Sequence, residues 1–519
     1  MKKILFLCFI VLNIYNSTYA QITFRTTYQG IGAEKGYSVE VCADGYLIVG
    51  STNSFGAGQN DVLVIKTDLN GTPVWKKNYG GFNNDLGLKV KKINDGNFII
   101  AGITNSFTTD SMNFYILKID STGGLLWSGI FGGPNQDSAT SFIQTYDNGL
   151  LVVGSTTSIG AGNRDVYLLK LDAAGNYLWA KAIGNSGNDI ATAVLEMSDH
   201  GFLITGYTDG FGFGGNTPFL LRTDSVGIVQ WVKTYHLPTW SSPKDSRAYD
   251  IIEGFSNDYI FVGQECCGFI GDGRHFVIDV DSLGNPYWMK DYQFNSGASS
   301  ARSVIKTLDG KFLVGGIYSW GQTQLLKINT LGAVVWDYYY NAGEGYEVKS
   351  TPDNQCVFTG YEAAAGDYKM FLIKPRADGT LNCQSNPTFT AMLSNITPAI
   401  ASQTFTSTMT NFNLIDSCIV STSGISFTTL CINTNIENIQ TDKSFSIYPN
   451  PANDLITLKS NVEGTLVITD ITGRKLLDGA VQIPLTNVSL ESLEPGIYSV
   501  TIYSGGHSFK SFRVIKSPH

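Results

Sequence analysis

Short apolar runs that end in glycine recur along most of the chain. The runs LIVG, IIAG, LVVG, LITG, IFVG, FLVG and VFTG end at Gly50, Gly102, Gly154, Gly206, Gly263, Gly315 and Gly360. Most are followed by a second apolar run, such as VLVIKTD or FYILKID, which closes on an Asp with a glycine three residues later. An Asp accepts hydrogen bonds from its own backbone and a glycine supplies positive φ, so these pairs predict hairpin turns.

Tryptophans mark the period of this pattern. Trp75, Trp127, Trp179 and Trp231 are separated by 127−75, 179−127 and 231−179, which are all 52 residues. Each unit reads as four short strands that are separated by turn residues. In the second unit we expect the strands to be Leu88 to Ile93, Asn97 to Gly102, Phe114 to Asp120 and Leu126 to Ile130.

Seven such units predict an all-β fold, a seven-bladed β-propeller over residues 21–381, because WD and kelch repeats run at roughly 40 to 50 residues. A β-solenoid, which usually repeats at shorter intervals, is the less favoured alternative. No tryptophan strand follows the run Phe371 to Gly379, whereas ITFRTTYQG near the amino terminus resembles VWKKNYGG. We therefore expect Ile22 to Tyr28 to be the outer strand of the last blade, which would remove an open sheet edge.

The first twenty residues have the pattern of a signal peptide. Lys2 and Lys3 precede an apolar run, and the small residue Ala20 offers a cleavage site. The mature chain has no other apolar run long enough to cross a bilayer. The formal net charge of −9, with a pI of about 5.1, argues against a nucleic-acid partner, because phosphate binding requires concentrated Lys and Arg.

The last part of the chain has a different composition. Residues 382–442 are rich in Ser, Thr and Asn and predict a linker segment, and residues 443–519 alternate apolar and polar positions, which predicts a small Ig-like β-sandwich. The segments SIYPNPANDLITL, VITDITGRKLL, LEPGIYSVTI and FRVIK occur in this order from Ser446 to Lys516. Together they resemble the type A sorting domain of the type IX secretion system of Bacteroidota.

This resemblance implies a route for the whole protein. It implies export to the periplasm, passage across the outer membrane by the type IX machinery, and removal of the domain by a sorting protease, with release or attachment at the cell surface. The residues that carry the sorting motif are Tyr448, Pro449, Asn450, Pro451, Asp470, Gly473, Pro495, Gly496, Tyr498 and Lys516. The prolines and glycines also suit turns in a sandwich.

Candidate metal and disulfide sites are few. Cys383, Cys418 and Cys431 follow the propeller, where a disulfide would staple the segment. Cys266 and Cys267 are compatible with a zinc site only if His275 and further ligands join them, so we favour two structural cysteines. The loops SFGAGQND and SIGAGNRD offer one carboxylate each to calcium, and a purely structural role is favoured there too. No cofactor is predicted.

Long loops gather on one face of the predicted ring, and that face is the candidate binding surface. The fifth unit is extended, since 288−231 is 57 residues, and we predict a ligand site formed by Trp240, Arg247, Arg274, His275 and Trp320. In the alternative, these rings cap the propeller core. No catalytic constellation is recognisable. The sequence predicts a secreted or surface binding protein for a glycan or protein ligand; a polysaccharide-acting enzyme and an envelope scaffold are the alternatives.

Overall fold

The computed structural model describes two parts of the chain. The first is residues 22–381 except 108–110, 211–214, 237–244, 267–272, 294–297, 319–320 and 365–366. The second comprises residues 392–395, 399–403, 406–409, 419–421, 426–433, 446–448, 454–459, 464–470, 474–482, 485–504 and 507–516. The regular elements of these residues are all β-strands. The described residues contain no helix that is long and apolar enough to cross a membrane. The predicted signal peptide lies outside the described residues.

Four antiparallel sheets follow one another along the first half of the chain. Sheet one contains β2 (Glu34–Cys42), β3 (Gly45–Thr52), β4 (Asp61–Thr67) and β5 (Pro73–Gly80). Sheet two contains β6 (Asp85–Lys92), β7 (Phe98–Thr104), β8 (Asn113–Ile119) and β9 (Leu125–Phe131). Sheet three contains β10 (Asp137–Gln144), β11 (Leu150–Thr156), β12 (Asp165–Leu171) and β13 (Tyr177–Gly184). Sheet four contains β14 (Asp189–Glu196), β15 (Phe202–Thr208), β16 (Thr217–Thr223) and β17 (Val229–His236).

Three further sheets complete the series. Sheet five contains β18 (Asp245–Glu253), β19 (Tyr259–Cys266), β20 (Arg274–Val280) and β21 (Pro286–Gln293). Sheet six contains β22 (Ser299–Lys306), β23 (Phe312–Tyr318), β24 (Gln322–Ile328) and β25 (Val334–Tyr340). Sheet seven contains β26 (Glu344–Ser350), β27 (Cys356–Ala364), β28 (Asp367–Lys374) and β1 (Thr23–Gln29). The amino-terminal strand therefore pairs with β28, as the sequence predicts.

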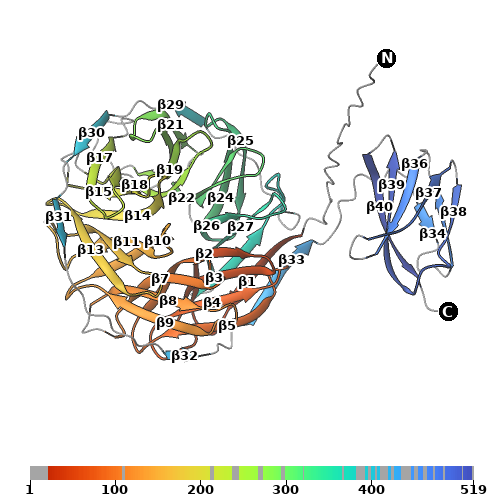
Figure 1. Cartoon of the computed structure of the whole chain (residues 1–519), viewed down its shortest axis with the longest axis horizontal. Helices are drawn as coiled ribbons and strands as arrows, with labels where there is room; N and C mark the ends of the chain where they lie inside the picture. The colour runs from red at the N-terminus through yellow and green to blue at the C-terminus, as the bar shows by residue number, and fades with distance from the viewer. Residues whose placement is uncertain are drawn as a thin grey trace, which may run out of the picture. The chain divides into compact units, whose positions relative to one another are not determined.

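The sheets are arranged radially around a centre (Figure 1). The first strand of each sheet contacts the first strand of the next, and β2 contacts β26, so the ring is closed. This is the arrangement of a β-propeller. Because neighbouring strands are antiparallel, the short turns such as β2–β3 and β4–β5 lie on one face of the ring. We call it the short-turn face, and the opposite face, which holds the longer connections, the long-loop face.

The recurrent glycine has a steric cause. In every sheet the register between the first two strands shifts at the same place, as it does between Gly36 and Ser38 in sheet one. A Cβ on the facing Gly50 would lie 1.7 Å from the carbonyl oxygen of Lys35, so only glycine fits there. In sheet six the facing residue is Gly316. The assignment of Gly315 to this repeat position is therefore wrong by one residue.

Adjacent sheets meet where an aromatic ring covers a turn glycine. The Trp75 ring of sheet one lies over Gly123 in the β8–β9 turn of sheet two, and Tyr79 donates a hydrogen bond to the Gly123 carbonyl at 2.7 Å. The other ring and glycine pairs are Phe24 with Gly71, Trp127 with Gly175, Trp179 with Gly227, Trp231 with Gly284, Trp288 with Gly332 and Trp336 with Gly379. The tryptophan period is thus the period of the contacts between sheets.

The segment predicted as a linker contributes strands of its own. These are β29 (Met392–Asn395), β30 (Ala399–Gln403), β31 (Thr406–Met409), β32 (Ile419–Ser421) and β33 (Ser426–Asn433). In this order they pair with β21, β17, β13, β5 and β1, so the chain runs backwards around the outside of the ring (Figure 1). We call this segment the belt. It adds a fifth strand to five of the sheets, which the composition did not predict.

The second compact unit, residues 435–519, contains two sheets. One is formed by β34 (Ser446–Tyr448), β35 (Leu455–Lys459) and β38 (Leu485–Ser489). The other is formed by β36 (Gly464–Thr469), β37 (Lys475–Val481), β39 (Gly496–Ser504) and β40 (His507–Lys516). Ile456, Ile468, Val500 and Val514 are buried in the core of the unit. The boundary between the units lies at residues 434 and 435, eight residues before the predicted boundary at 442 and 443.

Two of the mature chain's cysteines have described side chains. Cys42 and Cys356 are buried free thiols, and burial raises their pKa values, to about 11 for Cys42 and about 12 for Cys356. The thiols of Cys266, Cys267, Cys383, Cys418 and Cys431 lie outside the described residues. The predicted disulfide of the segment after the propeller therefore stays a prediction.

We predict that Gly123→Ala destabilises the propeller more than Gly96→Ala. Both glycines have positive φ, +75° and +87°, so each substitution strains the backbone by about 1–2 kcal/mol. An added Cβ at Gly123 would lie 2.9 Å from the Trp75 ring, whereas at Gly96 it would meet nothing within 4 Å. The extra loss should be about 1–3 kcal/mol in urea unfolding. Equal losses in the two variants would show that the ring does not press on this turn.

Candidate functional site

The first four sheets share one hydrogen-bonded arrangement on the long-loop face. A buried carboxylate begins the inner strand of each, and these are Glu34, Asp85, Asp137 and Asp189. In sheet two, Asp85 accepts hydrogen bonds from the amide of Gly81 at 2.7 Å and the hydroxyl of Ser106 at 2.6 Å. Burial raises the pKa of all four carboxyl groups, to about 6 for Asp189. The repeated acid therefore fixes a loop and has a structural role.

Sheets five and six carry Ser246 and Ser299 at the position of this acid, and sheet seven departs further. The register places Gly343 where sheet one has Glu34, and Glu362 where sheet one has Thr52. Gly343 has a φ of +81°, and a Cβ there would lie 2.1 Å from the carbonyl oxygen of Tyr361. The acid that supports a loop in the first four sheets is thus missing from this position, and a new carboxylate is introduced beside it.

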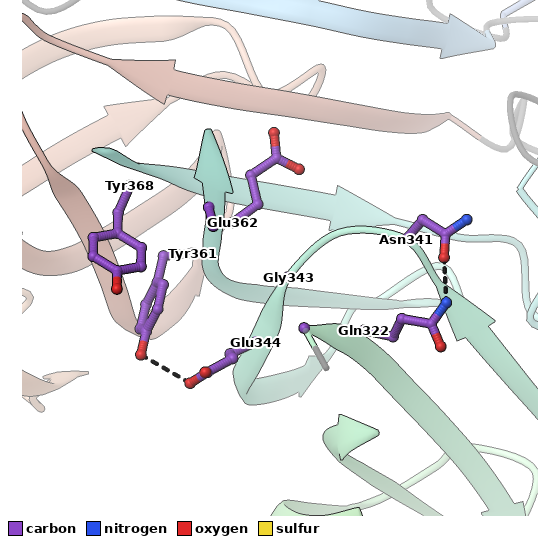
Figure 2. Close-up of a pocket in the computed structure, with 9 residues that line it drawn as sticks. Gln322, Asn341, Gly343, Glu344, Tyr361, Glu362 and Tyr368 are labelled. Atoms are coloured by element: carbon purple, nitrogen blue, oxygen red, sulfur yellow. Dashed lines mark hydrogen bonds between the residues drawn. The ribbon is translucent and has the colours of Figure 1, made fainter. Parts of the chain in front are cut away.

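A cavity of about 560 Å³ lies beside Gly343 and Glu362 (Figure 2). It is lined by Gly321, Gln322, Asn341, Gly343, Glu344, Tyr361, Glu362, Ala363 and Tyr368. These residues come from the β23–β24, β25–β26 and β27–β28 connections and the strand ends beside them, which all belong to the long-loop face of sheets six and seven. We call this cavity the seam pocket. The cavity lies on the face that the sequence analysis favoured for binding, and its residues were not among those predicted.

One side of the seam pocket is a hydrogen-bonded group of phenols around a carboxylate. Glu344 accepts hydrogen bonds from Tyr361 at 2.8 Å and from Tyr346 at 3.0 Å (Figure 2 draws the first). The two tyrosine rings stack with centroids 5.5 Å apart. Burial raises the pKa of Tyr346 to about 12 and that of Tyr361 further. Both phenols therefore stay protonated and act as donors to Glu344.

The other side is fixed by residues from neighbouring parts of the ring. Arg25 of β1 forms an ion pair with Glu362 at 2.6 Å and donates to the Asn341 carbonyl oxygen at 2.8 Å. The ammonium of Lys35, in β2, lies 4.2 Å from the ring centroid of Tyr368 and 5.0 Å from that of Tyr361. The strand that closes the ring thus also shapes the seam pocket.

The residues predicted to bind a ligand are not brought together in the described part of the chain. Trp240 and Trp320 lie outside the described residues. Arg247 is half-buried, bonded to Asp245 at 2.7 Å and stacked over the Tyr207 ring at 5.0 Å.

The structure places Arg274 and His275, two further residues of the predicted ligand site, within a strand. Both lie in β20 and are buried in sheet five. Arg274 is paired with Asp291 at 2.6 Å, and burial lowers the pKa of His275 to about 3. His275 is therefore a neutral core residue.

The inner strands hold a second group of charged residues. Glu347 of β26 accepts hydrogen bonds from Ser38 at 2.5 Å and from Lys89 at 2.6 Å, and lies 3.3 Å from the Lys349 ammonium. Burial alone would raise its pKa, but Lys349 and Lys89 lower it to about 2. Glu347 is therefore held as an anion within an ion-pair network, and it is unsuited to donate a proton.

Comparison with known proteins adds the clearest functional information for the second unit. Residues 446–516 match the secretion system C-terminal sorting domain. The chain carries this sorting domain. It implies export to the cell surface or secretion, and interaction with the type IX machinery.

Other likenesses are distant. Regulatory protein FlaEY of Caulobacter vibrioides is 26% identical over 164 residues, which are 27% of this chain and 17% of that protein. The Dos1 propeller is 11% identical and covers 67% of this chain and 94% of its own, with a TM-score of 0.35. PorZ of Porphyromonas gingivalis is 12% identical and covers 93% of this chain and 81% of its own, with a TM-score of 0.27. At such identities and scores none of these proteins carries an argument about ligands.

Several residues of the sorting motif have structural contacts. Lys516 is buried and donates to the carbonyl oxygens of Leu490 at 2.8 Å and Leu493 at 2.6 Å. Tyr498 donates to the Glu494 carbonyl oxygen, and Asp470 accepts from the Arg474 amide at 3.0 Å. Pro495 is exposed and Gly496 begins β39, while only the backbone of Tyr448 is described. Pro449, Asn450, Pro451 and Gly473 lie outside the described residues.

The two loops considered for calcium end in buried acids. Asp61 and Asp165 are each about 1% exposed, and Asn113 holds the same position in sheet two. Asp165 accepts a hydrogen bond from the Gly162 amide at 3.2 Å. Burial, and then the charge of Asp85, raise the pKa of Asp61 to about 6. Among the described residues, no group of three or more His, Cys, Asp or Glu side chains is placed to hold a metal ion.

We predict that Asp61→Asn removes a pH-dependent cost. Because the folded pKa of about 6 exceeds the ordinary 3.8, Asp61 contributes stability below pH 4 that is lost as the pH rises through 6. The variant, which copies Asn113, should therefore gain about 1–3 kcal/mol relative to the native chain between pH 4 and pH 7.5 in urea unfolding. Asp120→Asn is the control, since turn hydrogen bonds led by Thr122 lower the pKa of Asp120 and reverse the sign. Calcium-dependent stabilisation that Asp61→Asn abolishes would instead identify a cation site.

Proposed function

We propose that this chain is an exported, seven-bladed β-propeller that binds an extracellular glycan or protein ligand in the seam pocket, followed by an Ig-like sorting sandwich. One observation carries the proposal: polar groups line a cavity of about 560 Å³ beside Gly343 and Glu362, where sheet seven differs from the first four sheets. This volume falls within the roughly 300–1,000 Å³ of small-molecule sites. The sorting domain supports a location where such ligands occur.

The first alternative is a polysaccharide-acting enzyme. The seam pocket contains two carboxylates, Glu344 and Glu362, and paired carboxylates are what glycoside hydrolysis requires. Glu362 is already paired with Arg25, and Glu344 with two phenols, which favours a fixed binding surface over proton transfer. Release of reducing ends from a polysaccharide by the purified chain, abolished by Glu344→Gln, would establish hydrolysis in place of binding.

The second alternative is a scaffold of the cell envelope. A scaffold binds a protein partner and no small ligand. The belt supports this alternative because its strands cover the outer edges of five sheets. Ligand binding and a scaffold role differ in how they respond to substitutions in the seam pocket. A scaffold would keep its partner when the polar groups of the seam pocket are removed.

The test is a glycan and polysaccharide array screened with the mature chain from Gln21. We expect binding that is lost in the double variant Gln322→Ala and Asn341→Ala, because these amides line the seam pocket. A second double variant, Trp240→Ala and Trp320→Ala, examines the loops that the sequence analysis favoured. Loss of binding in the tryptophan variant alone would place the site on those loops. The absence of any binding by a folded chain would remove the glycan ligand and favour the scaffold.

A further inference from the structure

The seam pocket has a balanced charge. Two carboxylates, Glu344 and Glu362, line the cavity, and two cations, Arg25 and Lys35, contact residues that line it. Arg25 forms an ion pair with Glu362, and the Lys35 ammonium lies over the Tyr368 ring. A ligand with a net charge would bring an uncompensated charge into this partly enclosed site, which costs free energy. The arrangement therefore favours a neutral ligand.

The pocket contains planar amide and carboxylate side chains, each with two polar atoms. Gln322 donates from its amide to the side-chain oxygen of Asn341, as Figure 2 shows, which leaves the Asn341 amide as a donor and the Gln322 oxygen as an acceptor. Glu344 presents a carboxylate whose orientation is set by Tyr346 and Tyr361. Planar groups that accept at one atom and donate at the next match neighbouring hydroxyl groups, since each hydroxyl both donates and accepts.

An aromatic surface completes the site. Tyr368 is 37% exposed, and its ring lies at the wall of the cavity (Figure 2). Lys35 holds the ring from one side, and Tyr361 meets it edge-on with centroids 5.2 Å apart. A held, partly exposed aromatic ring offers a flat apolar surface at little entropic cost. Such a surface suits the apolar face of a sugar ring.

We propose that the seam pocket binds a neutral saccharide, with Glu344, Asn341 and Gln322 bonding its hydroxyl groups and Tyr368 contacting its ring. The inference rests on the proposed function, of which it specifies the ligand class. Peptides with charged side chains and acidic or amino-substituted sugars are disfavoured because they would disturb the charge balance around Arg25 and Lys35. A single polar pocket of this size accommodates a short segment of a chain rather than an extended surface.

The test is titration calorimetry of the mature chain with tetrasaccharides. Cellotetraose, xylotetraose, mannotetraose and maltotetraose are the neutral probes, tetragalacturonate is the acidic probe and chitosan tetrasaccharide is the cationic probe. We expect a neutral probe to bind, and Glu344→Gln to weaken it about tenfold or more, because a hydrogen bond to a charged acceptor is replaced by a neutral one. Tyr368→Ala should weaken it similarly. Tyr146→Ala removes an exposed ring from the short-turn face and is the matched control, with unchanged affinity.

The outcomes separate the ligand class from the site. Binding of only the acidic or cationic probe, if it is lost in Glu344→Gln, overturns the neutral saccharide and leaves the seam pocket as the binding site. Binding of a neutral probe that survives both Glu344→Gln and Tyr368→Ala overturns the seam pocket itself. If none of the neutral probes gives a heat of binding at millimolar concentration, the saccharide proposal is overturned. A protein ligand for the pocket would then be a separate matter.

Discussion

The ring depends on one strand that reaches it from the amino terminus. β1 completes sheet seven by pairing with β28, and its Phe24 and Tyr28 repeat at the seam what Trp75 and Tyr79 do between sheets one and two. The Tyr28 hydroxyl donates to the Gly71 carbonyl oxygen at 2.7 Å, across the junction between sheets seven and one, where β2 also contacts β26. Without β1, the edge of β28 would be open, and open edges invite pairing with other chains.

The strand that closes the ring also contributes to the walls around the seam pocket. Arg25 lies between Phe24 and Tyr28 and reaches Glu362 and the backbone of Asn341 at the seam pocket. On its other edge β1 pairs with β33 of the belt, so the strand is held on both sides. The belt is the part of the chain that leads to the sorting domain. Removal of that domain beyond residue 434 would leave β33 and the seam in place.

Regular features were predictable because they repeat. The tryptophan spacing predicted the sheets, and the resemblance of Ile22 to Tyr28 to a tryptophan strand predicted the outer strand of the last sheet. The structure confirms that β1 (Thr23–Gln29) joins this sheet beside β28, and it places β33 outside β1. The belt was not predicted, because its strands pair with distant edges and have no repeat of their own. The seam pocket was not predicted because the enlarged fifth unit is the more conspicuous departure from the repeat, although Glu362 stands where sheet one has Thr52. Burial of His275 follows from its place in a strand rather than from its chemistry.

The most direct test of this account is amide hydrogen exchange of β1 in the mature chain, followed by mass spectrometry. β9 is the natural reference, because it is also the last strand of its sheet and pairs on one edge only among the described residues. If β1 closes the ring and is held by β28 and β33, its amides exchange much more slowly than those of β9 and about as slowly as those of the internal strand β4. Exchange of β1 as fast as or faster than that of β9 would contradict closure of the ring by the amino-terminal strand.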